Sequence, residues 1–139
     1  MQFSYDTRLT DYGFEMVPRV PVIFTNPKTG MNIPLFCLVD SGATDVLIHR
    51  QAAELIGINP ESGEKRLYGG VGGDVVGYKH SVKIRLADDR HEFTIECAVL
   101  DLPYYEGLLG QNGFFDNYKV IFEKYINRIE LRPRIRSKR

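Results

Sequence analysis

The sequence has few cysteines and no long apolar run. Its two cysteines, Cys37 and Cys97, are too few for a disulfide framework, so a reducing compartment is expected. The longest stretch without a charged residue, Thr29–Val39, contains polar and proline residues and is too short to cross a bilayer. The first residues, Met1–Asp6, lack the basic and apolar regions of a signal peptide. These absences favour a cytoplasmic protein with no membrane span.

The chain also lacks a net charge, because 18 basic side chains balance 18 acidic ones. The balance hides an asymmetry: residues 131–139 carry five cations and no acid, which leaves 13 basic and 18 acidic groups in the body of the chain. An acidic body repels phosphate backbones, so no nucleic acid is expected as a partner. We assign residues 133–139 to a basic, frayed C-terminal tail, with an anionic docking patch as the alternative.

The composition favours one folded domain made mostly of strands. Apolar side chains make up 43% of the chain and aromatic ones 12%, which excludes a disordered protein. The segments between turn-forming residues are short, apolar and rich in β-formers, so we predict an all-β fold with one or two short helices. The predicted helices are Arg50–Ile58, closed by Gly57, and Asn112–Tyr118, capped by Asn112. The predicted strands are Arg19–Thr25, Asn32–Val39, Asp45–Ile48, His80–Leu86, His91–Leu100, Lys119–Glu123 and Arg128–Leu131.

An acid directly follows an apolar strand in the segment Val39-Asp40-Ser41-Gly42-Ala43. An acid at the end of a buried strand is costly unless it is hydrogen-bonded or functional. Ser41 offers a hydroxyl group, while Gly42 and Ala43 are small enough for a backbone or a substrate to approach. The motif therefore indicates a functional carboxylate, and an ordinary turn between two strands is the alternative.

Two glycine-containing segments follow this acid along the chain. Gly69-Gly70-Val71-Gly72-Gly73 lies between two strand-like arms and by itself predicts no more than a floppy hairpin turn. It lacks the Gly-Lys-Ser/Thr of phosphate-binding loops, which argues against a nucleotide-binding module. Leu108-Leu109-Gly110, followed by Asn112, is an apolar strand end that in isolation is an ordinary strand–helix junction.

Together and in this order, the three segments resemble the retroviral-type, or retropepsin-like, aspartic protease family. The resemblance covers residues 19–132 and implies a closed β-barrel that forms half of an acid protease. Residues 1–18 are left as an N-terminal segment and a candidate dimer-interface strand. Family members cleave peptides or proteins with two aspartates and no cofactor: one carboxylate activates water and the other protonates the carbonyl oxygen. Because this chain has a single Asp-Ser/Thr-Gly motif, the resemblance implies an endopeptidase that is a homodimer, with Asp40 as the catalytic residue of each protomer.

The resemblance also implies roles for residues around Asp40. Ser41 would lock the two catalytic loops together across the dimer, and the backbone of Gly42 would accept a hydrogen bond from the substrate. Val71, at the tip of a glycine-rich flap, would donate its N–H to the substrate. Leu108, Leu109 and Gly110 would pack beneath the catalytic loop. The other residues that the resemblance places in the site are Ala43 in the catalytic loop and Asp45, Gly69, Gly70, Gly72 and Gly73 at the substrate and flap.

Three positions depart from the viral members of the family. Those members place an arginine at the position of Gln111, paired with an aspartate at the position of Thr44. Two neutral side chains replace that ion pair here, which leaves no stranded charge but removes a usual dimer-stabilising contact. Asp74 stands where viral flaps carry an apolar residue, which predicts looser flap packing.

Other functions have less support in the sequence. His49, His80 and His91 show no metal-ligand spacing, so we expect no metal site. Cys37 and Cys97 lie in apolar strands and are predicted to be packed thiols, although a Cys–His nucleophilic pair stays open as an alternative. The main rival to the endopeptidase is a catalytically silent dimerisation or peptide-binding domain with the same fold.

Overall fold

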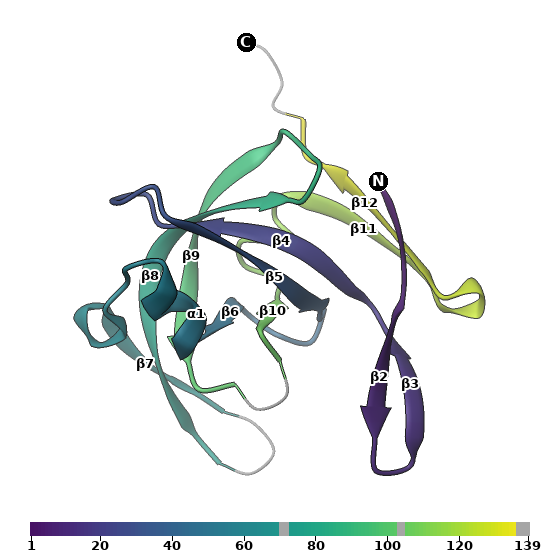
Figure 1. Cartoon of the computed structure of the whole chain (residues 1–139), viewed down its shortest axis with the longest axis horizontal. Coiled ribbons are helices and arrows are strands. Elements are labelled where there is room, and N and C mark those ends of the chain that lie inside the picture. The colour runs from purple at the N-terminus through teal and green to yellow at the C-terminus, as the bar shows by residue number, and fades with distance from the viewer. Residues whose placement is uncertain (70–72, 103–104, 136–139) are drawn as a thin grey trace.

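The computed structural model describes residues 1–69, 73–102 and 105–135 and is built almost entirely of strands (Figure 1). Within these residues no helix has the length and apolar character needed to cross a membrane. The helical elements are α1 (Arg50–Leu55) and the short 3-10 helices η1 (Pro60–Ser62) and η2 (Lys124–Ile126). The strands are β1 (Gln2–Ser4), β2 (Asp6–Thr10), β3 (Gly13–Val17), β4 (Arg19–Thr25), β5 (Asn32–Val39), β6 (Val46–His49), β7 (Glu64–Tyr68), β8 (Val75–Leu86), β9 (Glu92–Leu100), β10 (Gly107–Leu109), β11 (Tyr118–Glu123) and β12 (Arg128–Pro133).

The main sheet has the strand order β4-β5-β10-β6-β9-β8-β7. Because β4 also pairs antiparallel with β8, the sheet curls round and closes on itself (Figure 1). In β4 every second side chain, Val20, Val22 and Phe24, is buried inside this barrel, as the two-residue period of a strand requires. The prediction of an all-β, closed-barrel fold with few helices is therefore confirmed.

Two smaller sheets lie outside the barrel. β1 pairs with β12, which pairs with β11, so the first and last strands of the chain share one three-stranded sheet. Ile129 and Leu131 of this sheet are fully buried, and the ring of Phe114 stacks on Tyr118 with centroids 4.8 Å apart. The second sheet is the hairpin of β2 and β3, which extends away from the body (Figure 1).

The helix predicted over Asn112–Tyr118 is wrong, because this segment forms a series of turns. Gly113 has a φ of +97°, which breaks the helical path directly after the expected cap. The Asn112 side chain does not cap a helix; its amide donates to the Asp45 carboxylate instead. The other predicted helix is confirmed but ends earlier, at Leu55, because Ile56 and Gly57 leave the helical conformation there.

Candidate active site

Asp40 stands at the end of β5, directly after the buried Val39. Its N–H donates to the Leu109 carbonyl at 3.0 Å, and its carbonyl accepts from the Ala43 N–H at 3.2 Å, which closes a turn. The Gly42 N–H donates to Oδ1 of Asp40 at 2.9 Å. A Cβ at position 42 would lie 3.3 Å from the same oxygen, so glycine makes this close approach possible. The turn thus holds a partly exposed carboxylate in one orientation.

β10 runs beneath this turn, parallel to β5 and antiparallel to β6. Leu109 is fully buried there and lies opposite Val39 in the register. Gly110, the next residue, passes so close to the turn that an added Cβ would collide with the carbonyl oxygens of Asp45 and Ala43. The structure therefore brings Leu108, Leu109 and Gly110 against the segment that carries Asp40, which is the arrangement that the sequence resemblance implies.

The residues after Gly110 are bonded to the same turn. The Gln111 N–H donates to the Ala43 carbonyl at 2.9 Å, and the Asn112 N–H donates to the Thr44 carbonyl at 2.8 Å. The side-chain amide of Gln111 donates to the Ser41 carbonyl at 2.8 Å. Gln111 therefore ties two segments of its own chain together through neutral groups.

Asp45 is the most heavily bonded side chain near Asp40. Its Oδ2 accepts from the Lys79 ammonium at 2.9 Å and from the Tyr68 hydroxyl at 3.0 Å, while Oδ1 accepts from the Asn112 amide at 3.2 Å. The side chains of Asp45 and Lys79 are only 12% and 16% exposed, which makes this the most buried ion pair with a lysine or arginine in the described part of the chain. Burial raises the pKa of Asp45, but the bonds from Lys79, Asn112 and Tyr68 and the charge of Lys79 outweigh it, so the pKa lies below its ordinary value.

Tyr68 and Lys79, which complete this network, carry no signal in the sequence. Tyr68 ends β7 and Lys79 lies in β8, 34 residues from Asp45, so only the folded sheet brings them together. In the sequence, Lys79 looks like Lys83 and Arg85, the other cations of the same strand. A pattern of apolar positions could not have distinguished it, because the contact joins residues 34 positions apart that only the folded sheet brings together.

β7 and β8 form the arms of the glycine-rich hairpin predicted from the sequence. They pair antiparallel up to Tyr68 and Val75, so residues 69–74 connect them. Gly73 has a φ of +113°, which favours glycine, whereas a Cβ at Gly69 would make ordinary contact with Asp74 at 3.5 Å. The predicted site residues Gly70, Val71 and Gly72 lie outside the described residues. The loop end of β7 is bonded to the body of the chain, since the Tyr68 hydroxyl donates to Asp45.

The sequence profile of a family described as aspartyl protease matches residues 30–112, a range that contains Asp40, the glycine-rich hairpin and Gly110. The chain belongs to the aspartyl protease family. This confirms the resemblance to retropepsin-like proteases that the sequence indicates. No curated protein gives a significant match to the chain.

Solved structures place this aspartyl protease family member among retropepsin-like folds. A retropepsin-like aspartic protease from Rickettsia conorii is 15% identical, with a TM-score of 0.61 over 93% of this chain and 97% of that one. The EIAV protease in complex with the inhibitor HBY-793 is 24% identical, with a TM-score of 0.53 over 70% of this chain and 84% of that one. The retroviral protease-like domain of Ddi1 from Leishmania major is 17% identical, with a TM-score of 0.53 over 84% and 94%. At these identities the likeness establishes the fold.

A hollow of about 430 Å³ opens next to the segment that follows the Asp40 loop. Thr44 and Asp45 line one side of it, and residues 66–69 of β7 and its extension line the other. Lys79 and Asn112 form part of the lining between them. The hollow is open to solvent, and its lining carries the acids Asp45 and Glu96 and the cations Arg66 and Lys79.

The histidines and cysteines of this family member make no alternative site. His49 accepts from the Gln51 N–H at the start of α1, His80 lies 2.8 Å from the Pro60 carbonyl, and His91 pairs with Asp89. Among the residues that the structure describes, no group of three His, Cys, Asp or Glu side chains is placed to hold a metal. Both cysteines are buried and free, and burial raises the pKa of the Cys97 thiol to about 12 and that of Cys37 further. A thiolate nucleophile is therefore disfavoured.

Proposed function

We propose that the protein is an aspartic endopeptidase that cleaves peptide bonds as a homodimer, with water activated between the Asp40 carboxylates of two protomers. The observation that carries this proposal is the geometry of Asp40: a single, partly exposed carboxylate is held by backbone hydrogen bonds at the end of a barrel strand. Peptide hydrolysis by carboxyl groups needs two of them about 3 Å apart, which share one proton and titrate as a pair. One chain offers one such group, so a second copy is needed to complete the site.

The remaining site residues receive roles in this proposal. Ser41, Gly42 and Ala43 form the loop that presents Asp40, with Ser41 facing the partner loop and Gly42 accepting from the substrate. Leu108, Leu109 and Gly110 support the loop from beneath. A peptide in the hollow of about 430 Å³ would lie against Thr44 and Asp45, which follow this loop, and against residues 66–69 of the hairpin. Residues 19–132 form the catalytic domain in this assignment, with residues 1–18 and 133–139 as additions to it.

The test replaces Asp40 by asparagine, which keeps the size of the side chain but removes the shared proton. We expect Asp40→Asn to lower peptidase activity on a degenerate peptide library by about a thousandfold or more, with the fold kept. Asp101→Asn is the matched control, because the Asp101 side chain is 80% exposed and lies outside the Asp40 loop. Asp40→Asn that cleaves like the wild type would show that another group does the chemistry.

The dimer is tested by mixing. Wild type combined with excess Asp40→Asn should lose activity beyond simple dilution, because each mixed dimer has only one ionisable catalytic carboxyl. Activity strictly proportional to the wild-type concentration would exclude a shared site. A wild type that binds peptides without cleaving them at any pH would instead support the catalytically silent alternative.

A further inference from the structure

The N-terminal hairpin of β2 and β3 exposes its apolar face. Leu9 lies opposite Phe14 in the register, and these side chains are 73% and 77% exposed. The next pair on the same face is Thr7 with Met16, and Tyr12 in the connecting turn is fully exposed. Residues directly opposite each other share a face of the hairpin, so Leu9, Phe14 and Met16 lie on one apolar face. We call this face, together with Tyr12 at the tip of the hairpin, the arm surface. A contiguous exposed apolar patch marks an interaction site.

The opposite face of the hairpin is polar and is turned toward the rest of the molecule. Arg8 forms an ion pair with Glu15, and its guanidinium also donates to the Tyr105 hydroxyl. Asp6 is paired with Arg19 at 2.7 Å. A hairpin that packs on its own barrel would turn its apolar face inward, but here that face points to solvent. The polar face is therefore bonded to the rest of the chain, and the arm surface is the face that is free to contact another molecule.

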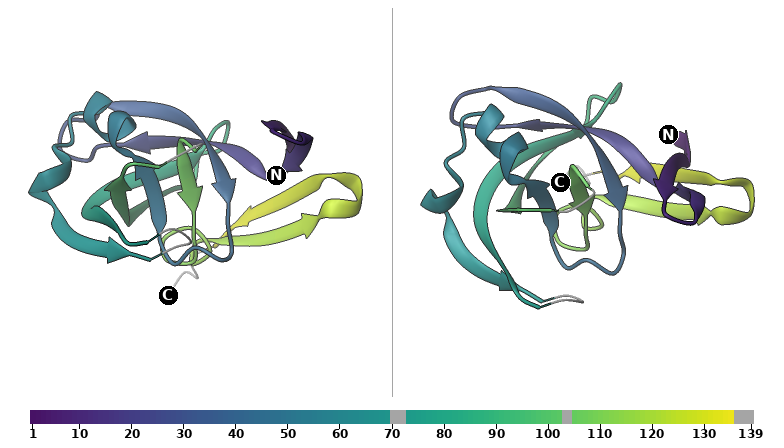
Figure 2. Two further views of the ribbon diagram at one scale, coloured as in Figure 1. Left: turned by 90° about the horizontal axis from the view of Figure 1, so that it is seen from below. Right: turned by 60° about the horizontal axis from the view of Figure 1, so that its bottom comes forward.

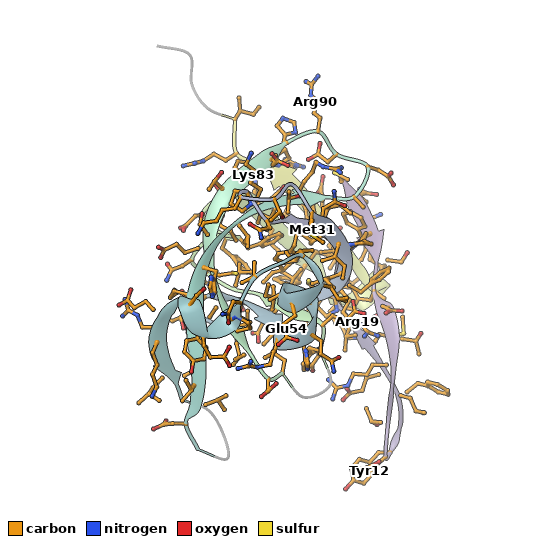
Figure 3. All side chains as sticks on the ribbon, turned by 60° about the vertical axis from the view of Figure 1, so that its left-hand side comes forward. Tyr12, Arg19, Met31, Glu54, Lys83 and Arg90 are labelled. Carbon is orange, nitrogen blue, oxygen red and sulfur yellow. The ribbon has the colours of Figure 1, made fainter. Side chains whose placement is uncertain are left out.

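The hairpin is attached directly to the strand that carries Asp40. The Val39 N–H, one residue before Asp40, donates to the Pro18 carbonyl at 2.9 Å, and Pro18 follows the last residue of β3. Two views show that the hairpin and the β7–β8 arms extend from the same end of the molecule, with the β5–β6 connection between them (Figures 1 and 2). Tyr12 lies at the far tip of the hairpin (Figure 3). A five-residue strand spans about 17 Å, so the hairpin reaches well beyond its anchor next to Asp40.

We propose that the arm surface docks on a second copy of this chain and clasps the dimer that brings two Asp40 residues together. This inference rests on the proposed function, because a second copy that delivers its own Asp40 must come within the reach of the hairpin. β1 is already paired with β12 of its own chain, whereas β2 and β3 pair only with each other. By symmetry each protomer extends one hairpin to the other, which makes the contact self-complementary.

The arm surface supplies a large part of the area that a dimer needs. A buried tyrosine or phenylalanine contributes about 150–250 Å² each, so Tyr12 and Phe14 supply about 300–500 Å² per hairpin. Two symmetric hairpins bury about 600–1,000 Å² of side chain, before the surface they cover on the partner is counted. A stable interface buries about 1,200–2,000 Å² in total. The hairpins therefore account for a large share of such an interface.

The test compares two double variants by analytical ultracentrifugation, both made in the Asp40→Asn background so that no readout depends on activity. Leu9→Ser/Phe14→Ser removes the opposed apolar pair of the arm surface. Tyr125→Ser/Ile126→Ser is the matched control, because these side chains are 82% and 46% exposed at the tip of the other protruding hairpin, β11–β12. We expect the arm variant to raise the dimer dissociation constant by about 30-fold or more and the control to leave it nearly unchanged.

A second measurement keeps the inference testable if the arm variant folds poorly. A photoreactive phenylalanine analogue at position 12, in a mixture of unlabelled and ¹⁵N-labelled chains, should give crosslinked peptides that combine both labels. Crosslinks within single chains alone, or an arm variant that dimerises like the control, would overturn the inference while leaving the proposed function intact. A chain that stays monomeric at every concentration would also overturn it, whatever else the hairpin binds. If the dimer depends on the arm surface but the chain with Asp40 intact cleaves no peptide, the proposed function would instead be refuted.

Discussion

The ion pair of Asp45 and Lys79 allows a sharp test of how the Asp40 loop is held. The two charges are 2.9 Å apart, and their side chains are 12% and 16% exposed. Exposed pairs contribute about 0–1 kcal/mol, whereas breaking a buried pair from one side costs about 3–5 kcal/mol, because a charge is left without a partner. This pair lies toward the buried end, so Asp45→Asn and Lys79→Met should each lower the free energy of unfolding by about 2–3 kcal/mol.

The double variant Asp45→Asn/Lys79→Met should be less damaged than the sum of the two, because it leaves no unpaired charge. We expect a coupling energy of about 2 kcal/mol from urea unfolding of the four proteins at one fixed concentration. Lys83 and Glu92, 3.8 Å apart and 42% and 43% exposed on β8 and β9, are the matched control pair. Their cycle should give less than about 0.5 kcal/mol. Additive effects at Asp45 and Lys79 would refute the view that the pair acts as a unit.

The same pair predicts how stability depends on pH. The pKa of Asp45 is lowered in the folded chain, so the stabilising contribution is present above the unfolded value of about 3.9. It is lost as the pH falls through the lower folded value. The difference in unfolding free energy between wild type and Asp45→Asn should therefore shrink as the pH is lowered from 5 toward 3. A difference that stays constant over this range would show that the carboxylate charge is not what stabilises the loop.

Two further predictions concern the backbone and the reaction. Gly110→Ala should lower the free energy of unfolding in urea by about 3 kcal/mol or more, since the added Cβ would collide with backbone carbonyls. Gly69→Ala is the control: its Cβ would make an ordinary 3.5 Å contact, so the same free energy should change by less than about 0.5 kcal/mol. Peptidase activity should show a bell-shaped pH profile whose limbs belong to the carboxyl pair, and chelators should leave it unchanged; loss of activity with a chelator and its return with zinc would contradict the mechanism.

The strands and the Asp40 motif could be predicted because their signals are local. Arg19–Thr25 and Asn32–Val39 match β4 and β5, since both are bounded by a turn in which Gly30 takes a φ of +75°. The wrong helix at Asn112–Tyr118 has a physical cause: the cap residue is bonded to Asp45, a partner 67 positions away. Contacts of that range leave no periodic trace in a sequence.

The β2–β3 hairpin was not predicted for a different reason. Its strands alternate as a hairpin should, but the apolar residues Leu9 and Phe14 point away from the barrel. Alternating apolar and polar residues show that the two faces of a hairpin differ, but they do not show which face contacts the body of the protein. That choice is made by Arg8 and Arg19, which bond to Tyr105 and Asp6. The orientation of the hairpin could therefore be known only from the folded chain.

The structure separates the forces that shape the Asp40 loop from those that we propose to join two copies. Gln111 bonds to the Ser41 backbone, and Asp45 bonds to Lys79, Tyr68 and Asn112 of the same chain. These contacts are complete in one protomer, so the loop does not need a partner to take its shape. The apolar side chains Leu9, Tyr12 and Phe14 of the arm surface, in contrast, remain exposed to solvent in the single chain. The ion pair and the arm surface share no residue and no bond. Removing the Asp45–Lys79 pair should therefore lower the stability of the protomer and leave the arm surface unchanged. Leu9→Ser/Phe14→Ser should instead weaken association of two copies and leave the Asp45–Lys79 coupling energy unchanged.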